Sequence, residues 1–188
     1  MSAFLSDGIV TLKPVERNDL ELLCAWRNDP EIRSRTREWK ALTSEDQARW
    51  FERITSPYRA DHMFVVMHHS TNVKVVPHEE ALMPIGVVGL CGWNMHDRHA
   101  EISFYIGERD ERGKGLMKRA LTLLIEWGFQ QGLHRIWAEV YDFNATSEKL
   151  LERLGFTYEG VLRQHAFRDG CFVNSILMGR LASDKSES

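Results

Sequence analysis

Arg112-Gly113-Lys114-Gly115-Leu116 decides the fold, because it joins a predicted strand from Glu101 to Ile106 to a long amphipathic helix that begins near Gly113. A strand, a glycine-bearing turn and a helix N-terminus expose unpaired backbone N–H groups, where the helix dipole adds about half a positive charge. Glycine lets an anion approach those amides and tolerates the backbone angles of a tight turn. The stretch predicts a cradle for a pyrophosphate group; the alternative is an ordinary strand-to-helix connection.

Two widespread nucleotide motifs do not fit this turn. A P-loop needs Ser or Thr directly after its lysine, whereas Lys114 is followed by Gly115. The dinucleotide fingerprint needs a third glycine three residues after the second, and position 118 is Lys. The expected ligand is therefore neither a nucleoside triphosphate nor NAD.

The composition indicates one soluble domain. The chain has 188 residues, 43% hydrophobic and 27% charged, which suffices for a core without disulfide or metal. We expect a single domain over residues 1–182 and a polar tail over 183–188. A net charge of -3 argues against general binding to nucleic acid or to an anionic membrane. Four basic residues either assist the proposed phosphate turn or form a solvated helix face: Arg112, Lys114, Lys118 and Arg119.

The cysteines and the absence of targeting signals predict a cytoplasmic protein. Cys24, Cys91 and Cys171 are odd in number and widely spaced, which favours reduced thiols over disulfides or a metal cluster. No secretory signal is recognised, and no apolar run approaches the ~20 residues of a membrane helix. The histidines lack metal-ligand spacing, so no metal site is predicted.

Hydrophobic periodicity predicts an α/β protein of the α+β type. Strands are expected before the glycine turn at residues 9–12, 62–68, 85–93 and 98–106, the last three as an antiparallel meander with an elongated tip from Ser70 to Pro84. Helices are expected at residues 20–26, 31–37 and 43–54. The turn is followed by the long helix, which ends near Gly132, and then by a strand at 136–140, a helix at 144–154 and a hairpin of strands 158–165 and 172–181 around Asp169-Gly170.

Two motifs in this order of elements resemble the GCN5-related N-acetyltransferase (GNAT) family. Residues 106–115, Ile-Gly-Glu-Arg-Asp-Glu-Arg-Gly-Lys-Gly, resemble its acyl-CoA pyrophosphate loop. Residues 144–147, Asn-Ala-Thr-Ser, together with 152–156, Glu-Arg-Leu-Gly-Phe, resemble its second cofactor element. The resemblance spans nearly the whole chain. It implies a mostly antiparallel twisted sheet of about seven strands flanked by helices, with acetyl-CoA as co-substrate and no metal.

Other stretches resemble one branch of that family. Residues 26–33, Trp-Arg-Asn-Asp-Pro-Glu-Ile-Arg, and 159–163, Glu-Gly-Val-Leu-Arg, are similar to enzymes that acetylate ribosomal-protein N-termini, spermidine or nucleotide-linked aminosugars. The resemblance implies transfer of an acetyl group to a primary amine by direct attack through a tetrahedral intermediate. It leaves the amine open, and we expect a monomer or a homodimer.

Two positions depart from the family pattern. Asp110 stands where members often begin the phosphate motif with Gln or Arg, and Leu151 stands where many carry a tyrosine that protonates the departing thiolate. Pyrophosphate binding is therefore expected to rely on backbone amides with basic side chains nearby. A phenolic acid at position 151 is excluded.

The resemblance also implies where the thioester lies. Phe104, Tyr105 and Ile106 fall in the strand that binds the pantetheine chain and offers a backbone N–H to the oxyanion. Arg112, Gly113, Lys114, Gly115 and Leu116 are the expected pyrophosphate turn. Asn144 is expected to contact the pantetheine amide, and it also suits the cap of its helix.

Glu101 and Ser147 are the candidate catalytic residues. An alkyl amine with a pKa near ~10.4 is almost fully protonated at pH 7, whereas an α-amine near ~8 needs less help. Glu101 is predicted on the same strand face as Ser103 and Tyr105 and is the first choice of base, unless it is only an exposed strand carboxylate. Ser147 either hydrogen-bonds the departing sulfur or is a helix-surface serine.

Trp26, Arg27 and Asn28 fall where the resemblance places the acceptor pocket. Arg27 either binds an acidic group of the acceptor or pairs with Asp29 or Glu31. The main alternative to an enzyme is a non-catalytic acyl-CoA-binding or sensing domain, since the sequence offers no unambiguous base. Acyl chains longer than acetyl also remain open.

Overall fold

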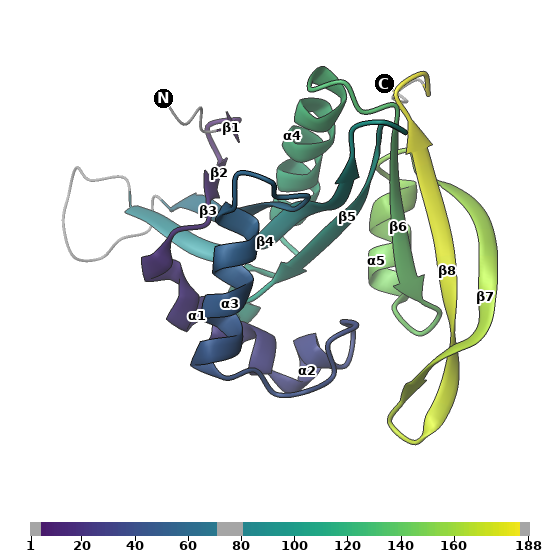
Figure 1. Cartoon of the computed structure of the whole chain (residues 1–188), viewed down its shortest axis with the longest axis horizontal. Coiled ribbons are helices and arrows are strands. Elements are labelled where there is room, and N and C mark those ends of the chain that lie inside the picture. The colour runs from purple at the N-terminus through teal and green to yellow at the C-terminus, as the bar shows by residue number, and fades with distance from the viewer. Residues whose placement is uncertain (1–4, 71–80, 185–188) are drawn as a thin grey trace.

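The protein is an α+β fold built on one mixed sheet. The structure is a computed structural model that describes residues 5–70 and 81–184. Eight strands of this described part form a sheet in the order β1-β2-β3-β4-β5-β6-β8-β7 (Figure 1). The strands are β1 (Leu5–Ser6), β2 (Val10–Pro14), β3 (His62–Ser70), β4 (Ala81–Asn94), β5 (His99–Ile106), β6 (Arg135–Tyr141), β7 (Thr157–Arg168) and β8 (Cys171–Leu181). The helices are α1 (Leu20–Asn28), α2 (Pro30–Arg33), α3 (Ser44–Thr55), α4 (Leu116–Gln130) and α5 (Ala145–Glu152), with 3-10 turns η1 (Arg17–Asp19) and η2 (Arg109–Glu111).

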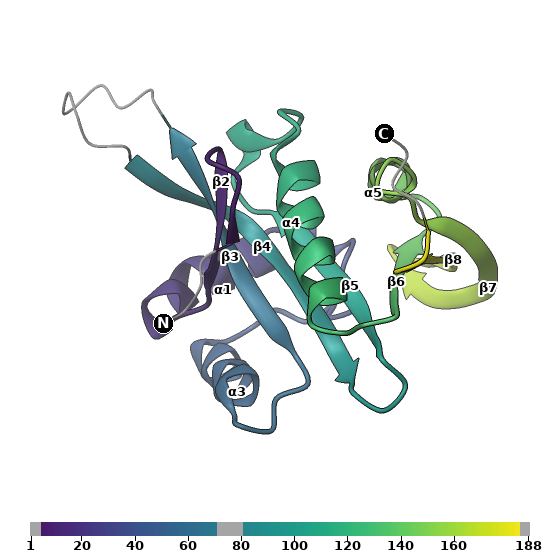
Figure 2. The ribbon, with the colours of Figure 1, turned by 90° about the horizontal axis from the view of Figure 1, so that it is seen from above.

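The helices cover both faces of the sheet and divide the core in two. Figure 2 shows α1 and α3 on one side of β3 to β5 and α4 on the other. Strand alternation sends Val66 and Val88 into the core beneath α4, and Val65 and Val87 into the core beneath α1 and α3. None of the helices in the described residues is long and apolar enough to cross a membrane.

The predicted order of the strands is confirmed, but several strands begin or end at other residues than predicted. About seven strands were expected; the additional one, β1, has two residues and pairs Leu5 with Leu12, which is too short for alternation to reveal. β4 begins at Ala81 instead of position 85, because its pairing with β3 continues to Ser70. β7 reaches Arg168 instead of position 165, because two register shifts let it follow β8 further. Residues 71–80 of the expected tip lie outside the described residues.

Two helices also differ from the prediction. α4 begins at Leu116 instead of near Gly113, because Gly113 and Gly115 have φ angles of 77° and 78°, which a helix cannot contain. α2 spans four residues from Pro30 instead of residues 31–37. The Asp29 side chain accepts a hydrogen bond from the Glu31 N–H, which fixes the start of α2. After α2 the chain forms turns whose backbone N–H groups bond to the carbonyl three residues earlier.

β5 and β6 are the one parallel pair among the strands of the described residues, and they stay paired for only three residues. Their register runs from His99↔Arg135 to Glu101↔Trp137 and then ends. Beyond it, β5 pairs with β4 alone and β6 pairs with β8 alone. The two strands diverge in Figure 1. Backbone groups on the open side of β5 after Glu101 therefore have no β6 partner, as expected for a strand that binds an extended ligand.

Candidate active site

A cavity of ≈ 670 Å³ lies where β5 and β6 diverge. Its walls come from α1, α3, the loop between α2 and α3, the two strands and the start of α5. Six of the residues predicted for the site line it: Arg27, Glu101, Phe104, Tyr105, Asn144 and Ser147. Trp26, Asn28, Ile106 and the turn from Arg112 to Leu116 are not part of this lining. The fold thus brings the predicted catalytic residues together with one of the three predicted acceptor residues.

The glycine turn exposes backbone N–H groups at the start of α4. Gly115 is the N-cap residue, no side chain caps the helix, and its first turn contains no acidic residue. A Cβ added at Gly113 or Gly115 would meet nothing within 4 Å. Across the described residues, the N–H groups of Gly113 and Leu116 have no acceptor, as follows from their place before the first helical hydrogen bond. The turn has the features of an anion site: free donors, a positive dipole end and open space.

The basic side chains near the turn have different roles. Arg112 donates to Glu31 Oε2 at 2.8 Å and to the Ile106 carbonyl at 3.2 Å, so it ties α2 to the end of β5. Lys114 pairs with Glu111 at 3.0 Å, and Arg119 pairs with Asp7 at 2.9 Å. Lys118 is exposed and has no ion pair among residues 5–70 and 81–184. Backbone amides are therefore the main donors that the turn offers.

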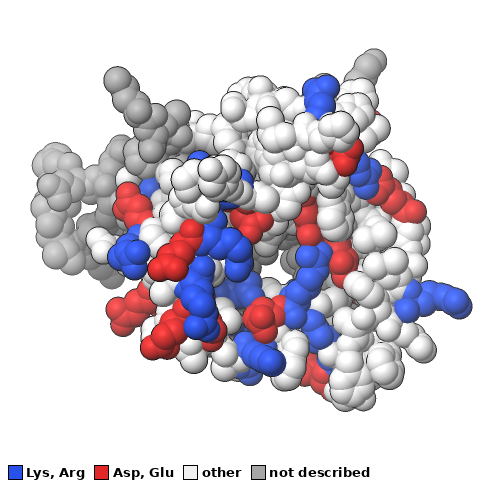
Figure 3. Space-filling view, viewed as in Figure 1, with Lys and Arg blue, Asp and Glu red and all other residues white. Residues whose placement is uncertain are grey.

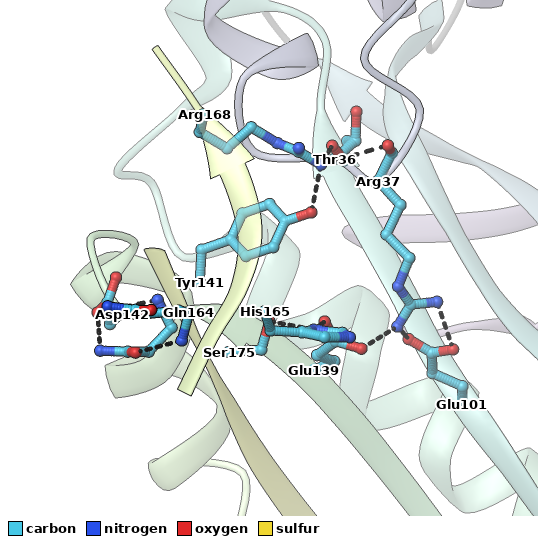
Figure 4. Close-up of polar contacts among 11 residues, drawn as sticks. Thr36, Arg37, Glu101, Glu139, Tyr141, Asp142, Gln164, His165, Arg168 and Ser175 are labelled. Carbon is cyan, nitrogen blue, oxygen red and sulfur yellow. Dashed lines mark hydrogen bonds and ion pairs between the residues drawn. The ribbon is translucent and has the colours of Figure 1, made fainter. Parts of the chain in front are cut away.

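Glu101 lies in the cavity, bound by an arginine that the sequence did not single out. Arg37, from the loop between α2 and α3, donates through Nη1 to Glu101 Oε2 at 2.8 Å and through Nη2 to Glu101 Oε1 (Figure 4). Arg37 Nη2 also contacts Glu139 Oε2 at 3.0 Å. The guanidinium thus bridges carboxylates from β5 and β6 at the point where the strands part. Glu101 is 16% exposed and is not the free strand carboxylate of the alternative interpretation.

Glu139 extends this network away from the cavity. His165 Nδ1 lies 3.1 Å from Glu139 Oε1 and 2.9 Å from Ser175 Oγ. Burial raises the pKa of Glu139, but the hydrogen bond with Ser175 and the charge of Arg37 outweigh it and hold the pKa below its usual value. Hydrogen bonding to Glu101 raises the pKa of Arg37 further above its ordinary range, so Arg37 is charged at any physiological pH.

The β7–β8 hairpin holds the loop that carries Arg37. Arg168 Nη2 donates to the carbonyls of Thr36 at 3.2 Å and Arg37 at 3.3 Å, and to the Tyr141 hydroxyl at 2.5 Å. These contacts, drawn in Figure 4, join the end of the sheet to the α2–α3 loop across the cavity mouth. The strand β6 residue Tyr141 also lines the cavity.

Two of the predicted acceptor residues have structural roles. Trp26 is buried, its indole donates to Glu108 at 2.9 Å, and its ring lies over Gly107, where an added Cβ would come within 2.0 Å of it. Asn28 donates to the Leu42 carbonyl at 2.9 Å and accepts from the Leu42 N–H at 2.8 Å, which fixes the loop before α3. Arg27 pairs with neither Asp29 nor Glu31, because Arg109 and Arg112 bind those carboxylates.

The start of α5 presents two polar side chains to the cavity. Asn144 occupies the N-cap position, but its side chain forms no capping hydrogen bond, so the capping role expected for it is wrong. Ser147 lies one turn further on, and both residues line the cavity. Leu151, in contrast, is fully buried in the core beneath α5.

Sequence reasoning missed Arg37, Glu139 and the residues that support them. Glu139 had one visible signal, a carboxylate in the otherwise apolar stretch 136–140, where alternation places it on the face opposite Ile136 and Ala138. Arg37 had none, because its loop shows no periodicity. Across residues 5–70 and 81–184, no three His, Cys, Asp or Glu side chains are grouped so that they could hold a metal ion.

Known proteins share this fold and this sequence pattern. Residues 10–157 match the acetyltransferase (GNAT) domain. An uncharacterized N-acetyltransferase of Bacillus licheniformis, p20, is 29% identical over 180 residues, which cover 92% of either chain. The crystal structure of spermidine N-acetyltransferase from Vibrio cholerae, in complex with CoA and spermine, has a TM-score of 0.80 at 24% identity and covers 95% of this chain and 98% of that chain.

A second solved structure gives the same result. RimL, a ribosomal-protein α-N-acetyltransferase solved in complex with coenzyme A, has a TM-score of 0.79 at 15% identity and covers 95% of this chain and 98% of that chain. At such identities the two structures show the fold. The matched domain covers most of the sequence and contains both diverging strands, the glycine turn and α5. The chain therefore belongs to the GNAT acetyltransferase family.

Proposed function

We propose that the protein transfers an acetyl group from acetyl-CoA to a primary amine by direct attack. One observation carries the proposal: the parted strands β5 and β6 form a cavity that contains Glu101, and the turn after β5 exposes N–H groups that have no acceptor among the described residues. An acyl-CoA needs an anion site for its pyrophosphate, an extended groove for pantetheine and a chamber for the thioester. Family membership supports the same assignment.

The chain supplies a partner for each part of acetyl-CoA. The amides from Gly113 to Met117 would bind the pyrophosphate, with Lys118 and Lys114 nearby. Beyond Glu101, β5 has no β6 partner among the described strands, so its edge from Phe104 to Ile106 would receive the pantetheine chain, and the Asn144 side chain, which lines the same cavity, would contact the pantetheine amide. A β5 N–H aimed at the thioester oxygen would stabilise the negative charge that develops there.

Glu101 is the group we assign to the amine proton. The neutral amine nitrogen attacks the thioester carbon, the C–N bond forms, and Glu101 accepts the proton directly or through water. Collapse of the tetrahedral intermediate breaks the C–S bond; the sulfur leaves as a thiolate that takes a proton from water, while Glu101 returns the amine proton to solvent. The Ser147 hydroxyl would hydrogen-bond that sulfur, since Leu151 offers no acid. Arg37 must move aside or share Glu101 with the incoming amine; its side chain is 55% exposed, so movement needs no opening of the core.

Release of free thiol from acetyl-CoA in the presence of primary amines tests this assignment. We expect Glu101→Gln to lower kcat by about 10²- to 10⁴-fold, the usual contribution of a general base, with the largest loss at acidic pH, where the smallest fraction of the amine is neutral. Glu38→Gln is the matched control, because Glu38 lines the same cavity but its carboxylate accepts only the Lys40 N–H among the described residues. Equal rates for Glu101→Gln and the control at every pH would remove Glu101 from the mechanism.

A non-catalytic acyl-CoA sensor is the second candidate. Two observations favour it: Leu151 replaces the usual acid, and Arg37 occupies both interior carboxylates. A sensor binds acetyl-CoA but releases no thiol above the hydrolysis background with any amine. Turnover with one amine of a panel of polyamines, peptides and aminosugars would exclude it.

A further inference from the structure

Three polar side chains in the cavity have hydrogen-bonding capacity that nothing in the described chain uses. Arg27 has a buried Nε without a partner and forms no ion pair among the described residues. Gln47, on α3, is only 5% exposed, and in the same part of the chain its side-chain amide has no hydrogen-bond partner. Tyr105, on β5, likewise has no partner for its hydroxyl within residues 5–70 and 81–184.

These three residues line the same cavity. Arg27 comes from α1, Gln47 from α3 and Tyr105 from β5. The Arg27 guanidinium carbon lies 6.0 Å from the centre of the Tyr105 ring, and the ring packs edge-on against Trp26. Burial raises the pKa of Tyr105 above its usual value, so its hydroxyl keeps its proton and can donate. The Arg27 side chain is partly exposed, but its Nε is shielded from solvent without a partner among the described residues; leaving such a donor unpaired is costly, which indicates that a ligand completes the site.

The carboxylates of the cavity, in contrast, already have partners. Arg37 binds Glu101 and Glu139. The Asp46 carboxylate accepts from Arg49 and from the N–H and hydroxyl of Thr43, Asp61 accepts from the Gly92 N–H, and Glu38 accepts from the Lys40 N–H. Figure 3 shows Lys and Arg side chains gathered over α3 and the loop before it, beside a hollow. A polycation would find few free carboxylates here, whereas an anion finds Arg27 unpaired.

We propose that Arg27, Gln47 and Tyr105 form a subsite for a carboxylate carried by the acceptor, so that the substrate is a primary amine with an acidic group. The inference rests on the proposed acetyl transfer and names its substrate class. Arg27 would bind the carboxylate with two parallel N–H groups, while Gln47 and Tyr105 donate to its remaining lone pairs. A free amino acid and the N-terminus of an acidic peptide share this chemistry. Polyamines do not.

Thiol-release kinetics with matched acceptors test the subsite. The acceptors are alanine against alaninamide, the peptide amide Ala-Glu-Ala-Ala against Ala-Gln-Ala-Ala, and spermidine. We expect the acidic member of at least one pair to be favoured about tenfold or more in kcat/KM, the discrimination that a charge-assisted hydrogen bond supports. The amino acid pair and the peptide pair distinguish the two sources of the carboxylate. A wild-type protein that uses neutral and acidic members equally, or prefers spermidine, overturns the subsite while leaving acetyl transfer intact.

Variants test which residues cause the preference for acidic acceptors. Arg27→Gln should bring the acidic-to-neutral ratio close to one, mainly through KM, and Arg27→Lys should restore part of it, because the charge remains but the planar fork is lost. Tyr105→Phe removes one donor without changing the ring and should lower the ratio less. Arg49→Gln is the matched control: Arg49 also lines the cavity but is exposed and paired with Asp46, so the ratio should persist. A ratio unchanged in Arg27→Gln contradicts the assignment.

A binding measurement keeps the subsite testable if the proposed activity fails. Calorimetric titration of the coenzyme A-bound protein with the acidic and neutral peptides requires no turnover. Tighter binding of Ala-Glu-Ala-Ala that is lost in Arg27→Gln supports the subsite even in a protein that releases no thiol. Equal affinity for both peptides overturns it. Retained acetyl-CoA affinity in each variant shows that the fold and the coenzyme site are intact.

Discussion

Arg37 connects the two interior carboxylates, and this sets the pH behaviour of the site. Its guanidinium contacts Glu101 and Glu139, while His165 and Ser175 contact Glu139 from β7 and β8. The charges facing Glu139 are therefore Arg37 and, when protonated, His165. Since the pKa of Glu139 is lowered in the folded protein, its ionised form stabilises the fold.

The stability of Glu139→Gln relative to the wild type should depend on pH. A carboxyl group with a lowered pKa contributes stability above its unfolded pKa, near ~4.3, and loses it as pH falls through the folded value. We expect the variant to be less stable by about 1 kcal/mol at pH 6 to 7, since Arg37 is half exposed, and the two curves to converge at more acidic pH. Urea unfolding at pH 7, 5 and 3.5 measures the difference. A difference that stays constant across this range would show that the ionised form contributes nothing.

Period-two alternation made Glu101 predictable, and nothing local made Arg37 predictable. Glu101 stands in a regular strand whose inward and outward faces can be read from the sequence. Arg37 reaches it from 64 positions away through a loop held by Arg168. The contact of Trp26 with Gly107 was unpredictable for a related reason: it joins two elements that are far apart in the sequence and that only packing brings together.

Gly107 allows the end of β5 to pack closely beneath α1. An added Cβ would lie 2.0 to 2.4 Å from three atoms of the Trp26 ring, which is buried and fixed by its hydrogen bond to Glu108. This contact positions the segment between the open strand and the phosphate turn. The requirement is for space, since Gly107 does not have a positive φ angle.

Gly107→Ala should therefore destabilise the fold. Overpacking a buried site costs roughly 1–3 kcal/mol, and the shift of Trp26 should also disturb the open edge of β5. Gly160→Ala is the control, because a Cβ there meets nothing within 4 Å and its φ angle is not positive. Chemical denaturation of the two variants measures the loss. Equal stability of Gly107→Ala and Gly160→Ala would show that Trp26 moves aside freely.

The glycine motif predicts that a turn follows the strand, but it does not predict the first residue of the helix after it. The existence of the turn and its place after a strand were predictable, as was the Asp169-Gly170 hairpin, where both residues have positive φ angles. The first residue of α4 was not, because a glycine next to a helix can either begin it or precede it. The positive φ angles of Gly113 and Gly115, which only the structure reveals, show that both glycines precede α4.

The whole sheet combines two packed halves that meet at the short β5–β6 ladder. The α4 core continues across both halves, from Val10 on β2 to Met178 on β8, and so the strands can part at one end without the domain dividing. At the open end, Arg168 of the hairpin joins the α2–α3 loop and closes the ring of contacts around the cavity. The divergence of β5 and β6 is thus stabilised by the shared core at one end and by the Arg168 contacts at the other.

Much of this architecture followed from the sequence because its elements are long and periodic. The α+β class and the order of strands and helices after residue 9 agree with the prediction. β1 was missed because two residues carry no pattern. The unpaired trio Arg27, Gln47 and Tyr105 was unpredictable as a group, since it draws on two helices and a strand that only packing brings together.

The central claim is that the amides of the glycine turn bind the pyrophosphate of acetyl-CoA, and calorimetric titration of two variants tests it most directly. Gly113→Asn and Gly113→Asp add side chains of the same size, and both residues tolerate the φ angle of 77° better than other substitutions. They differ in one negative charge beside the proposed site. We predict that Gly113→Asn keeps acetyl-CoA affinity within a few-fold of the wild type, whereas Gly113→Asp loses roughly tenfold to several hundredfold, the Coulomb cost of a carboxylate near a diphosphate at a protein surface. Equal acetyl-CoA affinity in the two variants would contradict the account.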